Sequence, residues 1–321
     1  MNRDQATKKI SLPERPYASL VLSVALLILT PFALSEKRTI VTEVESTASV
    51  IQGATEPVSK TNKGQTANIG FIKTDVGVWV INTGISHRHA TQIINAARNH
   101  YDSKIIGAVI LQAEREIALG ADTFQQQRIP VYAHPKTRDL MHAGCDLCID
   151  VLREILGEDE MSETKTATNI QDTRELEISD REDFYVIEPK KSVLPGAIMV
   201  YHPKTKTLFS GNLIFENLIP SIKNADLSAW RTTLEDLKTL DISAIIPTMG
   251  EVTSVLAIEA SLNYLRDLEN RTTQLYRDNT DLLSATELGH IEHYAKWKMY
   301  NDRHFNNVMY QYLHLESKDL N

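Results

Sequence analysis

The chain of 321 residues is poor in several residue types, and each scarcity excludes a class of protein. Two cysteines are too few for a disulfide scaffold. Thirteen glycines and 11 prolines exclude a collagen-like or low-complexity chain. Because 34 Lys and Arg face 42 Asp and Glu, the net charge is −8, and the chain lacks the basic surface of a general nucleic-acid binder. A hydrophobic content of 42% is that of a globular protein, and ten histidines are enough for a metal enzyme.

Long hydrophobic runs are also scarce, and the one exception lies near the N-terminus. Residues 17–35 carry no charge and follow a net positive segment, and the small residues Ala33 and Ser35 resemble a cleavage site. This pattern predicts that residues 1–35 are a signal peptide or an N-terminal anchor, with membrane contact only through residues 17–35. Removing residues 1–35 takes away four positive and two negative charges, which leaves an exported chain of net charge −10.

The rest of the chain alternates between hydrophobic runs typical of strands and stretches with helical spacing. A polar, Thr-rich stretch at 159–180 is expected to be an exposed insert, and Ser86 is expected to cap a helix over 86–100. Strand–helix order occurs twice, which predicts two packed sheets with helices outside, an α+β sandwich of four layers, αββα. Strands are predicted at 39–50, 69–74, 76–81, 105–111, 129–134, 184–189, 197–203, 207–211 and 242–247, and longer helices at 138–158, 227–240 and 252–314.

Several motifs, in their order along the chain, resemble those of the metallo-β-lactamase superfamily. A hairpin over 67–85 runs into a turn similar to D-T-G, and residues 200–213 resemble the strand pair that carries A-G-D. Residues 246–251 stand where the family has P-G-H-G. Together with a C-x-x-C helix and an aromatic tail, the order is most similar to the exported branch called quinoprotein relay system zinc metallohydrolases. The resemblance covers about residues 38–255 and implies one domain over 36–255 with a helical C-terminal extension over 256–321 packing on it.

Zinc is the cofactor that the resemblance implies, as a two-ion site that activates a water molecule. Every expected ligand position of that site is occupied by a different residue here. Ile117 and Val193 have no donor atom, and Asn212 lacks the charge needed to bridge two dications. The sequence therefore predicts a non-catalytic member of the superfamily without zinc. The ligand-equivalent positions hold Gln112, Glu114, Glu116, Ile117, Val193, Asn212 and Met249.

The replaced positions leave alternatives open. If residues 112–116 stay extended, Gln112, Glu114 and Glu116 share one side. They form either a pocket for a cation or for carboxylate chemistry, or a solvated loop in which Arg115 neutralises the carboxylates. We favour the solvated loop. The candidate pocket comprises Gln112, Glu114, Glu116, Asn212 and Met249.

Cys145 and Cys148 are expected to form a structural thiol pair or a local disulfide, since haem attachment would need histidine at Ile149. In the C-terminal tail, a stripe of large side chains either packs against the domain, as we favour, or docks a partner. The stripe comprises Tyr294, Trp297, Tyr300, His304, Val308, Tyr310 and Leu313.

The function expected from these observations is binding rather than hydrolysis. The branch resemblance implies a periplasmic setting in quinoprotein alcohol oxidation, with a dehydrogenase or its cytochrome as partner. One alternative is a divergent hydrolase with a pocket rebuilt around Glu114 and Glu116. Another is a small-molecule carrier that uses an apolar cavity lined by Ile117, Val193 and Met249.

Overall fold

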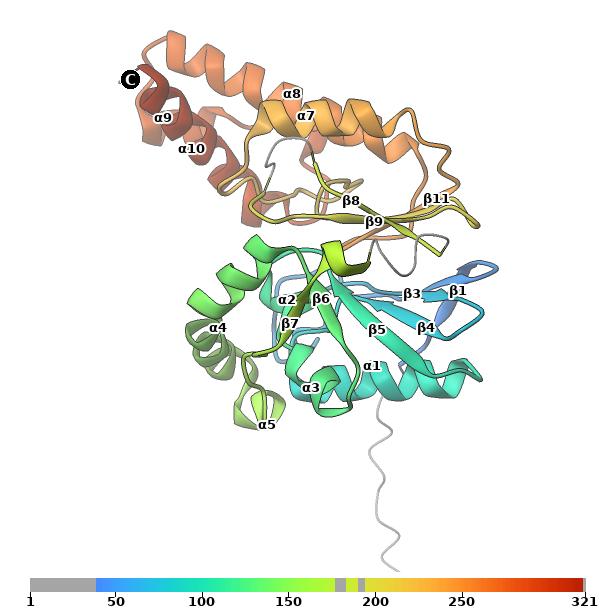
Figure 1. Ribbon diagram of the computed structural model, residues 1–321. Coiled ribbons are helices and arrows are strands. Elements are labelled where there is room, and N and C mark those ends of the chain that lie inside the picture. The colour runs from blue at the N-terminus through green and yellow to red at the C-terminus, as the bar shows by residue number, and fades with distance from the viewer. Residues whose placement is uncertain (1–38, 177–182, 190–193, 320–321) are drawn as a thin grey trace, which may run out of the picture. The chain divides into compact units, whose positions relative to one another are not determined.

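Two β-sheets lie face to face, with helices covering the outer face of each (Figure 1). The computed structural model describes residues 39–176, 183–189 and 194–319, and residues 39–321 form one compact unit. The predicted αββα sandwich is confirmed. The leader over 1–35 and Val193 lie outside the described residues. Within the described ranges, no helix is both long enough and apolar enough to cross a bilayer.

The first sheet has seven strands in the described part of the chain, arranged in chain order from β1 to β7. Strands β1 to β4 pair antiparallel, and β4 to β7 pair parallel. Helix α1 begins at its predicted cap, Ser86, whose side chain accepts a hydrogen bond from the backbone N–H of His89. The strands are β1 (Thr42–Glu45), β2 (Ala48–Ile51), β3 (Ile69–Lys73), β4 (Val78–Ile81), β5 (Ile105–Ile110), β6 (Val131–Ala133) and β7 (Ile170–Asp172). The helices of this half are α1 (His87–His100), α2 (Arg115–Ala118), α3 (Ala121–Gln126), α4 (Pro135–Leu156) and α5 (Glu158–Met161), with a 3₁₀ turn η1 at Thr173–Glu175.

The second sheet has the order β11-β10-β9-β8 among the described residues. Its strands pair antiparallel except β10 and β11, which run parallel. The strands are β8 (Tyr185–Ile187), β9 (Met199–His202), β10 (Thr207–Gly211) and β11 (Ala244–Pro247). The helices of this half are α7 (Leu227–Leu237), α8 (Leu256–Arg277), α9 (Leu282–Leu288) and α10 (Tyr300–Asp319), with a 3₁₀ turn η2 at Glu292–Tyr294.

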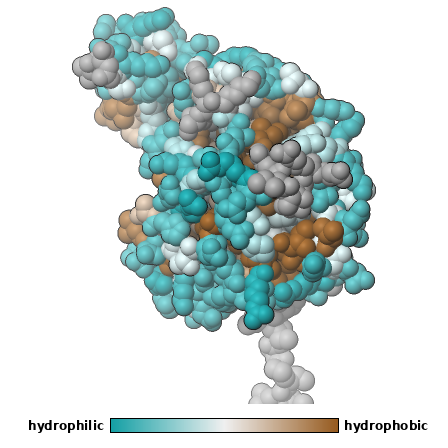
Figure 2. Space-filling model, in the orientation of Figure 1, coloured by the Kyte–Doolittle hydropathy of each residue, from teal (hydrophilic) through white to brown (hydrophobic). Residues whose placement is uncertain are grey.

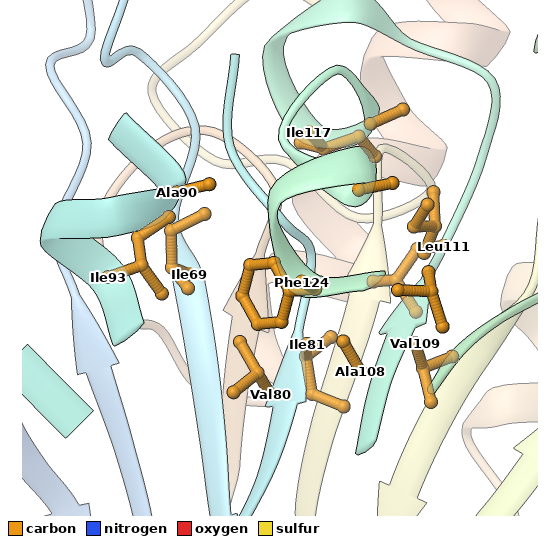
Figure 3. Close-up of a cluster of buried hydrophobic side chains, with 14 of the residues drawn as sticks. Ile69, Val80, Ile81, Ala90, Ile93, Ala108, Val109, Leu111, Ile117 and Phe124 are labelled. Atoms are coloured by element: carbon orange, nitrogen blue, oxygen red, sulfur yellow. The ribbon is translucent and has the colours of Figure 1, made fainter. Parts of the chain in front are cut away.

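A hydrophobic core lies between the sheets and continues under the helices of the first half. Phe209 of β10 packs directly over Gly70 of β3, where a Cβ atom would lie only 2.2 Å from the Phe209 ring. Glycine at this position therefore lets the two sheets approach closely. Figure 3 shows part of this core, in which Phe124 of α3 lies over the strand residues Val80 and Ile81, and Ile93 of α1 lies beside Ile69 of β3.

Two predictions about strands are wrong. The single edge strand expected over 39–50 is a hairpin, because the chain turns at Ser46 and Thr47 and β2 then pairs with β3. The exposed insert expected over 159–180 instead adds α5 and β7 to the first half. Its described apolar side chains are almost completely buried, namely Met161, Ala167, Ile170 and Leu176, and this burial outweighs the polar composition of the stretch. Residues 177–180 of the stretch lie outside the described residues.

The C-terminal helices pack on the second sheet through aromatic side chains. Tyr264 of α8 contacts Tyr294 edge-on and stacks on Trp297, and its hydroxyl lies 3.1 Å from Nδ1 of His304. Most of the predicted aromatic stripe is buried in this way, which confirms packing, although Leu313 is exposed. The helical layer over this sheet includes α8, which begins at Leu256.

Asn68, which directly precedes β3 in the first half, connects this half to the end of β11 in the second half. Its buried side-chain amide donates hydrogen bonds of 2.8 Å to the carbonyl oxygens of Pro247 and Gly250. Its side-chain oxygen, Oδ1, accepts hydrogen bonds from the side chain of Gln52 and from the backbone N–H of Gly53. This network fixes the loop after β11, which carries one wall of the pocket described next.

Candidate functional site

The candidate residues lie where strands of both sheets end. Gln112 and Glu114 follow β5, Asn212 follows β10 and Met249 follows β11. Parallel strands place their carboxyl ends at one edge of a sheet, and binding crevices of α/β proteins form outside such ends. The sandwich brings these ends together, because the side-chain oxygen of Gln112 lies 3.4 Å from the backbone nitrogen of Asn212.

A pocket of about 480 Å³ opens at this edge. Four of the five predicted pocket residues line it together, namely Glu114, Glu116, Asn212 and Met249. The fifth, Gln112, is buried behind them and contacts Asn212. The lining also includes the cationic side chains of Arg303 and Lys223 and the thiol of Cys148. Its apolar wall consists of Ile214, Phe215, Leu218 and Pro220.

Glu114 directly precedes α2 of the first half, and its carboxylate contacts Asn212 of the second half. Asn212 donates a hydrogen bond of 2.6 Å from Nδ2 to Oε2 of Glu114. Because α2 begins at Arg115, residues 112–116 do not stay extended, so the condition under which Gln112, Glu114 and Glu116 would share one side is not met. The solvated loop is also wrong for Glu114, which is partly buried, whereas Arg115 does pair with Glu116 at 2.9 Å.

Burial raises the pKa of Glu114 to about 7. The negative charge of Glu116 raises this pKa further, while hydrogen bonds from Asn212 and Gln112 and the charge of Arg303 oppose the rise. Near neutral pH the Glu114 carboxyl is thus present in both forms. It donates a hydrogen bond when protonated and only accepts when ionised.

Arg303 is the pocket residue that the sequence reasoning missed. It comes from α10, and its guanidinium donates to the carbonyl oxygen of Ile219 at 2.9 Å and to the sulfur of Met249 at 3.6 Å. Burial lowers the pKa of Arg303, and the charges of Glu114 and Glu116 oppose this effect, so the guanidinium keeps its positive charge. Arg303, Asn307 and Gln311 follow one another at intervals of four residues, so the sequence could show that they share a face of α10, but not that this face reaches the pocket.

Ile117 does not contribute to the pocket lining. Its side chain is fully buried and packs with Leu111 and the α1 residue Ala90 in the core cluster (Figure 3). Among the described residues, Ile117 therefore belongs to the core, and the pocket combines charged groups with one apolar wall.

Cys148 lies in the middle of α4 and lines the pocket. The side chain of Cys145 lies outside the described residues, so the pairing of the two cysteines stays a prediction. The structure adds a location for Cys148 that the C-x-x-C spacing did not indicate.

The side chains around the pocket do not fit a zinc pair. Asn212 uses its amide as a donor to Glu114, Met249 contacts Arg303, and the Arg303 guanidinium brings a positive charge to the pocket. Within the described ranges, no three His, Cys, Asp or Glu side chains come together in a way that could hold a metal ion. Zinc needs several negative or imidazole ligands in tetrahedral geometry, and this lining offers two carboxyls, one with a raised pKa, and the Cys148 thiol.

Comparison with known proteins identifies the fold. The sequence matches no family model and no curated protein. Three solved enzymes share the architecture: the DIM-1 metallo-β-lactamase (TM-score 0.54, 14% identity, covering 71% of this chain and 96% of that one), a metallo-β-lactamase from Pontibacter korlensis (0.53, 16%, 71% and 98%) and FIM-1 from Pseudomonas aeruginosa in its mono-zinc form (0.51, 17%, 71% and 94%). The chain has the metallo-β-lactamase fold. At these identities the likeness concerns the fold alone.

Proposed function

We propose that the protein is an exported binding protein on the metallo-β-lactamase fold, without zinc-dependent hydrolysis, and that its pocket holds a small organic anion. The observation that carries this proposal is the guanidinium of Arg303 inside a pocket of about 480 Å³. The positively charged side chain of Arg303 lies where a metallohydrolase would hold its metal ions, and it comes from α10 of the C-terminal extension.

The chemistry of the lining favours a carboxylate with an apolar body. Arginine presents five N–H donors in a planar fork that matches a carboxylate. Arg303 donates two hydrogen bonds within the protein, to Ile219 and Met249, so other N–H donors remain for a ligand. A protonated Glu114 adds an O–H donor. Phe215 and Leu218 supply an apolar wall for the remainder of the ligand.

Pairs of probes that differ only in charge test this proposal. Benzoate and hexanoate are expected to raise the melting temperature of the full chain, while benzamide and hexanamide are expected to leave it unchanged, because binding to the folded state alone stabilises it. Differential scanning fluorimetry measures both. Equal shifts for acid and amide, or no shift with any of the four, would overturn the proposal.

The cellular setting is part of the proposal. The basic leader with its uncharged run supports export, with anchoring to the inner membrane if residues 17–35 stay uncleaved. The branch resemblance supports a place beside a periplasmic quinoprotein dehydrogenase or its cytochrome. Fractionation of cells followed by affinity purification tests both points: recovery from the cytoplasmic fraction, or purification without a quinoprotein or cytochrome, would count against them.

A second candidate function, hydrolysis in a rebuilt pocket, is favoured by one observation. The raised pKa of Glu114, about 7, is suitable for a general acid or base. Turnover of p-nitrophenyl butyrate by the wild type, lost on Glu114→Gln while benzoate binding persists, would establish it. Glu287→Gln, which changes an exposed carboxylate on α9, is the matched control and should keep the wild-type rate. No turnover by the wild type above the buffer blank, or equal turnover by the wild type and Glu114→Gln, would exclude it for this ester.

A further inference from the structure

Lys223 is a second cationic side chain in the lining of the pocket. Most of the surface that Figure 2 shows is hydrophilic, so an exposed lysine alone marks no site. Lys223 is distinguished by sharing one pocket with Arg303. Its side chain is exposed and that of Arg303 is partly buried, so Lys223 lies nearer the mouth of the pocket.

The carboxyl groups of the lining leave these two cations without an ion pair. Glu116 pairs with Arg115, and Glu114 accepts a hydrogen bond from Asn212. In the part of the chain that the structure describes, neither of the two other cations of the lining forms an ion pair. The lining therefore carries three cations against two carboxyl groups, in a chain whose net charge is −8. A local excess of positive charge attracts anions.

The loop that carries Lys223 is fixed to the helix that carries Arg303. Arg303 donates a hydrogen bond of 2.9 Å to the carbonyl oxygen of Ile219. Asn307, one turn further along α10, is buried and accepts a hydrogen bond of 3.2 Å from the backbone N–H of Ile222. Lys223 directly follows Ile222, so its backbone lies next to this turn of α10. The two cations are thus held on one support.

The same loop supplies apolar surface for the ligand. Leu218 and Pro220 line the pocket on either side of Ile219, the residue that Arg303 binds, and Lys223 comes three residues after Pro220. A hydrocarbon chain whose carboxylate lies on Arg303 can follow this wall. Two carboxylates separated by apolar carbons would satisfy both cations and the wall, whereas a compact dianion would leave the wall without a partner.

We propose that the ligand of this pocket is a dicarboxylate with an apolar spacer, in which one carboxylate pairs with Arg303 and the other pairs with Lys223. The inference rests on the proposed function and adds the second charge of the ligand. Lys223 is then the residue that selects a dicarboxylate over a monocarboxylate. Because its side chain is exposed, the selectivity is modest, about fivefold in affinity, and weakens as salt screens the pair.

Matched acids test this selectivity. Isothermal titration calorimetry of the full chain at low ionic strength compares butanedioate, hexanedioate and octanedioate with butanoate, hexanoate and octanoate. At least one dicarboxylate is expected to bind about fivefold more tightly than the monocarboxylate of the same carbon number. Lys223→Met is expected to bring this ratio to about one. Lys318→Met, at an exposed lysine of α10 outside the pocket lining, is the matched control and is expected to keep the wild-type ratio.

Two results overturn the inference while monocarboxylates still bind, and both leave the proposed function intact. The first is a wild-type ratio of one or less for every pair of acids. The second is a ratio that Lys223→Met does not change. Phenyl phosphate that depends on Lys223 as strongly as the best dicarboxylate also overturns it, because both cations would then hold a single anionic group. Absence of binding by every acid overturns the proposed function and the inference together.

Discussion

Glu114→Gln is expected to stabilise the protein above about pH 7 and to leave its stability unchanged near pH 4. The pKa of Glu114 is about 7 in the folded protein against an ordinary value of 4.5, so folding favours the protonated carboxyl. The stability that this group contributes is fully present below about pH 4.5 and is lost as the pH rises through about 7. Glutamine keeps an oxygen that accepts from Asn212 and never ionises.

The size of this effect is on the order of 2 kcal/mol at about pH 8, because each pKa unit corresponds to about 1.4 kcal/mol and partial exposure reduces the total. For a chain of this size this is a rise in melting temperature of about 3 °C, since the unfolding entropy is roughly 2.1 cal/mol/K per residue. Thermal unfolding across the pH range measures it, with Glu287→Gln as the control. A difference between Glu114→Gln and wild type that does not depend on pH would show that Glu114 titrates normally.

Arg303→Met is expected to remove most of the stabilisation by benzoate. A bidentate arginine–carboxylate pair in a partly buried pocket contributes several kcal/mol to binding, so the affinity should fall about 100-fold. Methionine retains the apolar stem and loses the charge. Isothermal titration calorimetry compares the variant with the wild type.

Two further variants separate charge from geometry. Arg303→Lys is expected to recover part of the affinity, since lysine keeps the charge but lacks the planar fork. Lys318→Met removes a positive charge near the exposed end of the same helix and is expected to bind benzoate as the wild type does. Equal weakening by Arg303→Met and Lys318→Met would mean that the net charge of α10, rather than the pocket, attracts the anion.

Glu114, Asn212 and Met249 were predicted to lie together through the resemblance to the metallo-β-lactamase superfamily, because their positions correspond to ligands of one site in its motifs. The pattern of strands and helices did not group them by itself. Neither source showed the local shape of residues 112–116, because a helix of a single turn, α2, has no sequence period long enough to detect.

Arg303 could not be found in this way, because helical spacing shows which residues of α10 share a face and says nothing about which turn of the helix reaches the pocket. That depends on the packing of Tyr264, Tyr294 and Trp297, which sets where α10 begins. Ile117 illustrates the converse, since its position in the motif suggested a pocket residue and its apolar side chain instead fills the core.

Zinc content is the most direct test of the central claim that Arg303, Glu114 and Asn212, rather than metal ions, organise this pocket. Elemental analysis would use full chain purified without chelator, incubated with zinc and then dialysed against metal-free buffer. The account predicts far less than one zinc per chain, and the same content in Glu114→Gln. One or two zinc ions per wild-type chain, lost from Glu114→Gln, would contradict it.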